Sequence, residues 1–172
     1  MTQVMKFSKI YGMAQRHDEI KFLASGNCIL LFGFGKDNDE DKTGYIWRAE
    51  YDHRPTVEEV RNDINELVNQ HTDSKILNGF NWQGKPVYLS TENQFNFKAA
   101  YDLAVQTEGA ILPVKFKLGE DENGEPVYHT FRNLAPFADF VTKVVAYVSA
   151  TLAEGWELKD SVDYNALFGG NE

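Results

Sequence analysis

The chain has 172 residues, 42% of them hydrophobic and 25% charged, which is ordinary for a globular protein of one domain or two small lobes. Its formal net charge of −9 repels phosphate backbones and anionic lipids, so we expect no binding to nucleic acid or to a membrane surface. The single cysteine, Cys28, excludes an internal disulfide or a cysteine-based zinc site, and its apolar neighbours predict core packing.

The first third of the chain predicts a small antiparallel sheet. Residues 4–11 alternate between apolar and polar, and runs at 18–23 and 27–34 are separated by a Ser25-Gly26-Asn27 turn. A charged loop then precedes a strand at 45–51, whose alternation predicts one face made of Tyr45, Trp47, Ala49 and Tyr51.

A helix over residues 57–70 follows this sheet. Thr56 and Glu59 form a capping box, and apolar residues recur at helical spacing from Val57 to Val68. The polar segment His71-Thr-Asp-Ser74 reads as a connector. We therefore predict a β-rich lobe over 1–71 and a second lobe over 72–172.

The second lobe opens with a hairpin around the turn Gln83–Pro86. We expect Trp82 to face Val87 and Phe80 to face Leu89, with all four side chains on one buried face. Ser90 or Thr91 caps the next helix, about 92–107, and Thr91 with Gln94 fits a second capping box. The apolar residues expected to point inward from this helix are Phe95, Ala99, Ala100, Leu103 and Ala104.

The remaining elements are a second hairpin and a long helix. Strands at 112–116 and 127–131 flank the turn signal Asn123-Gly124. A helix over 134–153 is expected to stop at Gly155, and its apolar stripe is Phe137, Phe140, Val141, Val144, Val148 and Leu152. In the tail, Trp156, Leu158 and Val162 are expected docking points. The fold class is α+β, with a small N-terminal antiparallel sheet and helix followed by a β-hairpin–helix–hairpin–helix lobe.

Two loops imitate ligand sites. Asp37, Asp39 and Asp41 have the one-three-five spacing of a calcium loop, but the sixth and twelfth positions are Lys42 and Arg48, which oppose a cation. Gly33-Phe-Gly-Lys36 resembles part of a phosphate loop, yet Asp37 stands where Ser or Thr is required. We expect a solvated hairpin tip and a strand end, with no metal and no cofactor.

The four histidines (His17, His53, His71 and His129) lack the spacing of a metal site. Asp18 and Asp52 adjoin two of them, but neighbours on an extended chain point to different sides. No serine elbow is present either. A non-enzymatic protein is expected, and a hydrolase would require a histidine and a carboxylate that meet in a cleft.

Aromatic residues supply the remaining candidates. Trp47, Trp82 and Trp156 could stack on sugars, although Trp82 is assigned to the buried hairpin face. A carbohydrate-binding module would place an exposed tryptophan beside amides such as Asn93 or Asn96. The candidate partner-contact residues are Trp47, Tyr88, Asn93, Asn96 and Trp156.

The stretch Gly79-Phe-Asn-Trp-Gln-Gly-Lys-Pro-Val-Tyr-Leu-Ser-Thr-Glu-Asn-Gln-Phe95 resembles a pattern in tailed-bacteriophage and prophage proteins. In that pattern a glycine-aromatic hairpin leads through Ser-x-Glu-x-Gln into a helix, then into a short strand pair and a long helix. The later elements match at 112–116, at 127–131 and from Leu134 onward. The resemblance covers about residues 54–163 and is to an uncharacterised domain of tail-fibre and tail-fibre assembly proteins.

The resemblance implies a non-enzymatic virion component, associated with the tail or its fibres, that acts through contacts with other phage structural proteins. Virion parts are usually symmetric oligomers. No signal pattern or membrane-length apolar run is present in the sequence, so we expect synthesis in the bacterial host cytoplasm and residence in the virion. Two alternatives stay open: a tail-fibre assembly chaperone that the particle does not retain, and a carbohydrate-binding tip module.

Overall fold

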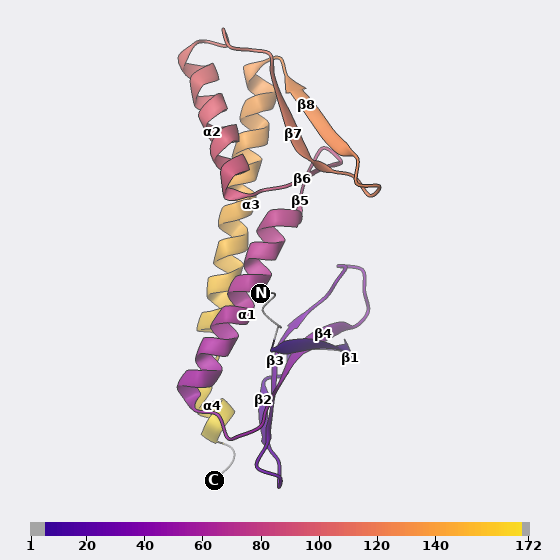
Figure 1. Ribbon diagram of the computed structural model, residues 1–172, viewed down its shortest axis with the longest axis vertical. Coiled ribbons are helices and arrows are strands. Elements are labelled where there is room, and N and C mark those ends of the chain that lie inside the picture. Colours follow the sequence, from indigo (N-terminus) through magenta and orange to yellow (C-terminus); the bar gives the residue numbers. More distant parts are fainter. Residues whose placement is uncertain (1–5, 170–172) are drawn as a thin grey trace. The chain divides into compact units, whose positions relative to one another are not determined.

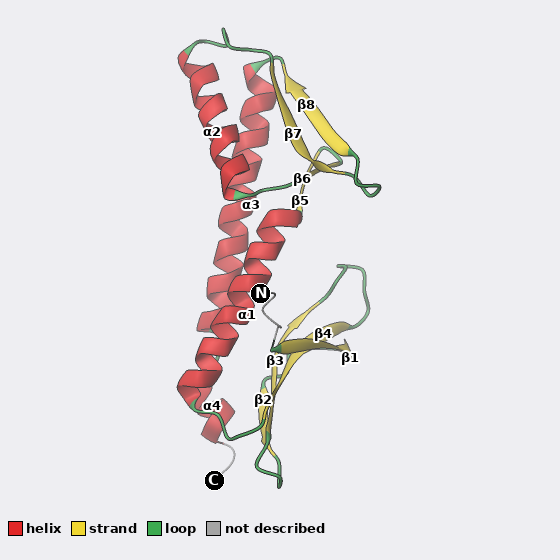
Figure 2. Ribbon diagram, in the orientation of Figure 1, coloured by secondary structure: helices red, strands yellow, loops and turns green. Residues whose placement is uncertain are grey.

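A computed structural model describes residues 6–169 and has the predicted α+β class, with strands and helices mixed along the chain (Figures 1 and 2). The chain divides into two compact units. One takes the described residues up to Asn69 and those from Glu157 onward, and the other is Gln70–Trp156. The long helices α1 (Val57–Asn78) and α3 (Leu134–Asp160) contribute residues to both units.

The first unit contains a four-stranded antiparallel sheet, as predicted. Its strands are β1 (Phe7–Met13), β2 (Glu19–Phe22), β3 (Cys28–Gly35) and β4 (Gly44–Tyr51). The strand order is β1-β4-β3-β2, so β4, the last strand of the sheet in the chain, lies between β1 and β3. The turn at Ser25–Asn27 and the charged loop before β4 lie where the sequence places them.

One face of this sheet and one stripe of α1 form the core of the first unit. Alternate residues of β3 and β4 face this core and pack with Val60, Ile64 and Leu67 of α1. The buried strand residues of the core are Phe7, Ile20, Cys28, Leu30, Phe32, Tyr45, Trp47, Ala49 and Tyr51. The last helix, α4 (Tyr164–Gly169), buries Leu167 in the same core. Residues 157–169 therefore belong with the first unit, which corrects their predicted placement in the second lobe.

Helix α1 does not end at residue 70. The Thr56 side chain accepts a hydrogen bond from the Glu59 amide at 3.1 Å, as the predicted cap requires, but the helix continues to Asn78. Residues 71–74 are therefore helical and not a connector. Thr72 and Ile76 are buried in the second unit, and this tertiary burial outweighs the polar composition of the segment.

Helix α3 likewise continues through Gly155, which was expected to stop it. A Cβ at Gly155 would lie 2.6 Å from Thr72 Oγ1. The glycine therefore allows α3 to approach α1 closely within the second unit, and it has no role as a helix terminator. The predicted stripe of α3 is confirmed, with Phe137, Phe140, Val141 and Val144 buried.

The second unit begins with the hairpin of β5 (Phe80–Trp82) and β6 (Lys85–Val87). Phe80 pairs with Val87 and Trp82 with Lys85, so the predicted pairing is wrong. The turn has only two residues, Gln83 and Gly84, with φ of 51° and 77°, values that match a tight type I′ turn. The four apolar side chains of the hairpin, Phe80, Trp82, Val87 and Leu89, are nevertheless all buried.

Helix α2 (Thr91–Gln106) presents a different face to the core from the one predicted. Ser90 is its cap, since its side chain accepts from the Asn93 amide at 3.1 Å. Phe97 and Ala104 are buried, whereas Phe95 is 70% and Leu103 48% exposed. The Phe97 ring fits between the rings of the core, which fixes the rotation of the helix.

The core of the second unit is largely aromatic. The hairpin of β7 (Val114–Glu120) and β8 (Pro126–Phe131) turns at Gly124, as predicted. Phe131 stacks on Phe137 at 4.4 Å between centroids. The other rings packed around these two are Trp82, Phe97, Phe116 and Phe140. Trp82 is 2% exposed and donates its indole N–H to Asp139 at 2.9 Å.

Candidate functional site

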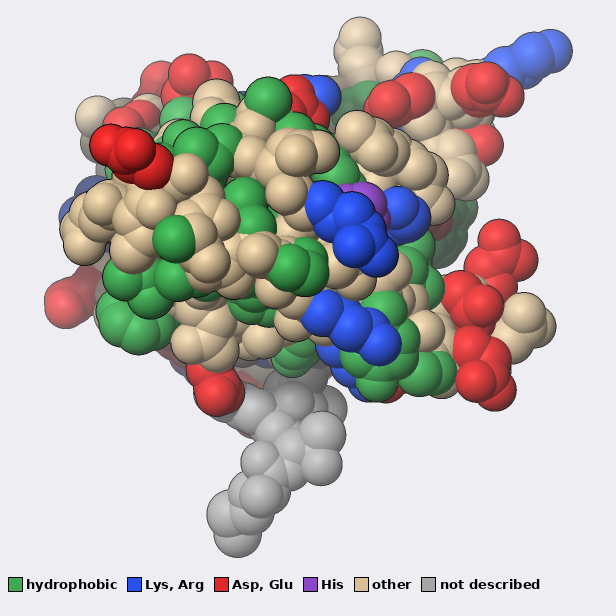
Figure 3. Space-filling model, turned by 90° about the horizontal axis from the view of Figure 1, so that it is seen from above, with side chains coloured by type: hydrophobic (Ala, Val, Ile, Leu, Met, Phe, Trp, Pro, Cys, Tyr) green, Lys and Arg blue, Asp and Glu red, His purple; other side chains and the backbone are tan. Residues whose placement is uncertain are grey.

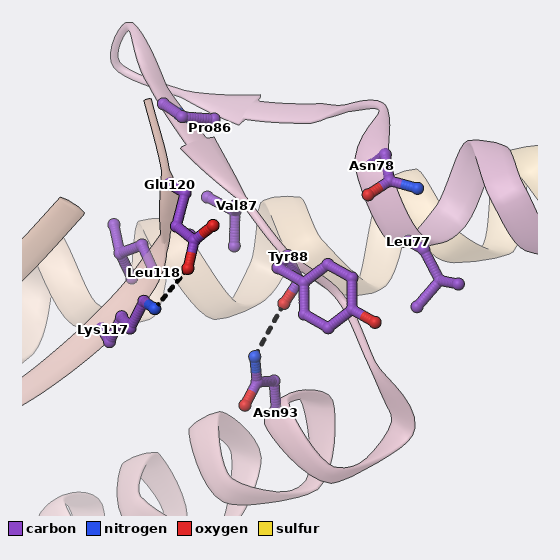
Figure 4. Close-up of a pocket in the computed structure, with 10 residues that line it drawn as sticks. Leu77, Asn78, Pro86, Val87, Tyr88, Asn93, Lys117, Leu118 and Glu120 are labelled. Carbon is purple, nitrogen blue, oxygen red and sulfur yellow. Dashed lines mark hydrogen bonds and ion pairs between the residues drawn. The ribbon is translucent and has the colours of Figure 1, made fainter. Parts of the chain in front are cut away.

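A pocket of about 530 Å³ opens on the second unit where the first hairpin meets β7 and the start of α2 (Figure 4). Val87 and Leu118 form a buried apolar floor, and polar side chains surround it. The residues between 6 and 169 that line it are Leu77, Asn78, Pro86, Val87, Tyr88, Asn93, Lys117, Leu118, Gly119 and Glu120. We call this the Tyr88 pocket.

The segment that carries Tyr88 is irregular, yet its backbone is fully hydrogen bonded. Tyr88 donates its amide to the Leu118 carbonyl at 2.8 Å, and its carbonyl accepts from Asn93 Nδ2 at 2.9 Å. Leu89 donates to the Leu77 carbonyl and accepts from the Gln94 side chain. Four bonds over two residues hold this linker in one conformation and fix the direction in which the Tyr88 ring projects.

Gly119 makes the junction between the two hairpins possible. A Cβ at this position would lie 2.8 Å from the Pro86 carbonyl oxygen and 3.3 Å from the Tyr88 amide nitrogen. Because real Cβ atoms do not approach backbone atoms that closely, a side chain there would push β7 away from β6. The glycine therefore permits the Tyr88–Leu118 hydrogen bond and the floor beneath it.

The polar groups of the pocket carry no net charge. Lys117 Nζ lies 2.7 Å from Glu120 Oε1, so the ammonium and the carboxylate neutralise each other, and the carboxylate raises the pKa of Lys117. Asn78 and Asn93 contribute amides. The Tyr88 ring is 45% exposed, and its hydroxyl has no hydrogen-bond partner among residues 6–169. Half-exposed aromatic surface thus lies beside several fixed donors and acceptors.

The structure separates the five candidate residues. Tyr88 and Asn93 line the pocket together, and Asn96 is exposed one turn further along α2 without lining it. Trp156 is 60% exposed on α3 and does not line the pocket. Trp47 is only 7% exposed, against the Tyr45 ring in the core of the first unit. As a surface platform Trp47 is therefore excluded.

Three polar lining residues escaped the sequence analysis: Asn78, Lys117 and Glu120. Asn78 ends α1 and the other two belong to β7, and none belongs to a motif. The one local signal was Gly119, an isolated glycine in a strand, which often marks a close backbone approach. Tertiary folding alone brings these side chains to the pocket.

A histidine does meet carboxylates in the first unit, contrary to the sequence argument. His53 Nδ1 lies 2.8 Å from Asp52, and Nε2 lies 3.0 Å from Glu59. The two neighbours converge because they sit in a bend after β4, where extended-chain alternation no longer applies. Asp52 first and Glu59 second raise the pKa of His53. When His53 is protonated, both ring nitrogens donate to these carboxylates, and no ring lone pair is then free to accept a proton.

Three other chemistry-bearing groups, Cys28, Lys85 and His129, are buried or partly buried. Cys28 is fully buried, and burial raises the pKa of its thiol, as expected for a core residue. Lys85 lies 3.0 Å from His129 Nδ1 at the edge of the aromatic core, and Figure 3 shows basic side chains gathered beside a histidine on the face seen from above. Within residues 6–169, no cluster of three or more histidine, cysteine, aspartate or glutamate residues could hold a metal ion.

The fold and pocket define a two-unit α+β protein with a rigid, charge-balanced surface pocket. A family described as a domain of unknown function (DUF4376) matches residues 59–169, which is more than half of the chain. The chain therefore belongs to this family. No curated protein and no solved structure matches this chain. Among the helices described, none combines the length and the apolar character that crossing a bilayer would require.

Proposed function

We propose that this chain is a non-enzymatic bacteriophage protein, a structural component of the virion associated with the tail or its fibres. It acts through contacts with other phage structural proteins, as part of an oligomer, after synthesis in the host cytoplasm. The phage assignment is supported by the sequence resemblance around Gly79–Phe95. The contact mechanism is supported by the surface of α2.

Helix α2 has apolar residues on two sides. Phe97 and Ala104 are in the core, with Ala100 and Tyr101 packed against it. Phe95, Ala99 and Leu103, spaced at i, i+4 and i+8, are exposed on another side, and we call them the Phe95 stripe. A surface helix normally has one apolar stripe, which faces its own core. A second stripe with a phenylalanine 70% exposed is the observation that carries the proposal, because covering it with a partner chain removes apolar area from water.

The test is mass spectrometry of purified particles from the phage or prophage that encodes the chain. We expect the wild-type chain in the particle and a clear loss of incorporation for the double variant Phe95→Asp, Leu103→Asp. Val105→Asp is the matched control, since Val105 is as exposed as Leu103, at 48%, but lies about 160° around the helix from Leu103. That control should be incorporated normally.

Two results would overturn parts of the proposal. A chain absent from particles but required to produce them would be an assembly factor, which is the alternative function. Equal loss of incorporation with Val105→Asp would show that the Phe95 stripe has no special role in the contact.

A further inference from the structure

We infer that the Tyr88 pocket binds an uncharged saccharide, either a free sugar or the terminal unit of a glycan. This inference concerns residues other than the Phe95 stripe and does not depend on the proposed virion role. The argument rests on what the pocket can and cannot recognise. Its volume, about 530 Å³, lies in the ordinary range for small-molecule sites.

The backbone around Tyr88 excludes recognition of an extended peptide by strand addition. Strand addition requires free amide and carbonyl groups on the receiving strand. The amide and carbonyl of Tyr88 are both already bonded, to Leu118 and Asn93, and Pro86 has no amide hydrogen to donate. A ligand of this pocket must therefore be recognised through side chains.

The charge balance excludes a phosphate or another strong anion. Among the described residues of the lining, Lys117 is the only cation, and Glu120 pairs with it at 2.7 Å. An anion would have to break this ion pair and then face the released carboxylate, in a chain whose net charge is already −9. A wholly apolar ligand would instead cover the Asn78 and Asn93 amides and the ion pair without replacing their hydrogen bonds to water.

A neutral sugar matches both properties of the lining. The apolar C–H face of a pyranose can cover the Tyr88 ring, which is 45% exposed and held by a rigid backbone. Its hydroxyl groups can both donate and accept, as do amides, while a carboxylate accepts and an ammonium donates. In the view of Figure 4 the Tyr88 ring lies between Asn78 on one side and the Lys117–Glu120 pair on the other. The hydroxyls of a ring stacked on Tyr88 would thus meet polar groups on two sides.

The experiment is a titration of the isotope-labelled full chain, followed by amide NMR. The probes are methyl glycosides of glucose, galactose, mannose and N-acetylglucosamine, their linear oligomers, and glucuronic acid as a charged comparison. We expect at least one neutral sugar to shift amides around Tyr88, Asn93 and Glu120. Tighter binding of an oligomer than of its monomer would identify a glycan as the source, and equal binding a free sugar.

Tyr88→Ala should weaken binding by about tenfold, the effect of losing one aromatic stacking contact. Tyr128→Ala is the control, because Tyr128 is 50% exposed in the same unit and lies outside the pocket. It should bind as the wild type does. Glu120→Ala should also reduce sugar affinity, and it tests the pocket independently of the tyrosine if Tyr88→Ala does not fold.

The inference is overturned if no neutral sugar shifts these amides, if only glucuronic acid binds, or if Tyr128→Ala loses as much affinity as Tyr88→Ala. Normal incorporation of Tyr88→Ala into particles would separate this result from the test of the virion role.

Discussion

The two units use aromatic residues in opposite ways. In the first unit, cationic side chains of the same unit cover ring faces: Lys6 lies 3.9 Å from the Tyr51 ring centroid, Lys9 lies 3.8 Å from that of Tyr45, and the Arg54 guanidinium lies 4.3 Å from that of Phe22. In the second unit, rings pack on rings in the interior, as Phe131 does on Phe137. Tyr88 and Phe95 are left 45% and 70% exposed.

This difference locates the available aromatic surface. A cation over an aromatic ring is attracted to the ring face, and it also blocks a partner from stacking on that face. The chain itself thus covers the Tyr51, Tyr45 and Phe22 rings of the first unit, and the acidic groups Asp63 and Asp37 in turn pair with Lys6 and Lys9. In the second unit Lys115 covers the Tyr128 ring in the same way, at 4.4 Å from its centroid. Among residues 6–169 no cation lies over Tyr88 or Phe95, and the proposed saccharide and partner contacts fall on these two residues.

The largest expected effect comes from opening the ring cluster of the second unit. Phe131 is fully buried, and Phe131→Ala should lower the free energy of unfolding by about 3–5 kcal/mol. Phe95→Ala, which removes a ring from the surface, should change it by less than about 0.5 kcal/mol. Denaturant unfolding followed by tryptophan fluorescence measures both, since Trp82 contacts Phe131 at 5.6 Å between centroids. Similar losses for the two variants would contradict the division into an inner and an outer set of rings.

An intermediate effect is expected at Gly119. Gly119→Ala should destabilise the protein by about 1–3 kcal/mol, because the added Cβ would meet the Pro86 carbonyl oxygen at 2.8 Å. Gly124→Ala serves as a control for the loss of a glycine: no atom lies within 4 Å of a Cβ there, although its φ of 79° adds local turn strain. Amide NMR should show that Gly119→Ala shifts Tyr88 and Leu118 and that Gly124→Ala leaves them unchanged. Unshifted Tyr88 signals in Gly119→Ala would show that the close approach does not hold the pocket together.

The smallest expected effect is a difference between the two units in how their stability depends on pH. Carboxylates raise the pKa of His53 above the ordinary value of about 6.5, so its stabilising contribution is present below that value and is lost as the pH rises through the folded-state pKa. Burial, and then the charge of Lys85, lowers the pKa of His129, so its contribution is present above about pH 6.5 and is lost as the pH falls.

Melting temperatures of the wild type, His53→Gln and His129→Gln across mildly acidic to mildly alkaline pH measure these contributions. His53→Gln should remove part of the loss of stability on the alkaline side. His129→Gln should remove part of the loss on the acidic side. If the two variants changed the same limb of the profile, the opposite environments of the two histidines would be refuted.

Local signals predicted most elements of the fold correctly. The strands of the first unit, the Thr56 and Ser90 caps, the turn at Gly124 and the buried stripe of α3 all follow from periodicity or turn chemistry within a few residues. The candidate site was only half predicted. Tyr88 and Asn93 belong to one short segment, but Asn78, Lys117 and Glu120 reach the pocket through long-range packing.

The sequence by itself determined the α+β class, the order of the elements and the burial of the Phe80, Trp82, Val87 and Leu89 hairpin face, because these depend on patterns a few residues long. Tertiary structure decided which side of α2 is covered, whether α1 and α3 continue past residues 71–74 and Gly155, and where Tyr88 projects. Each of those outcomes depends on a neighbour distant in the chain: the rings around Phe97, the contact of Thr72 with Gly155, and the Leu118 carbonyl that Gly119 admits to Tyr88. A helical pattern with two apolar sides cannot state which side will be buried, since both satisfy the same periodicity.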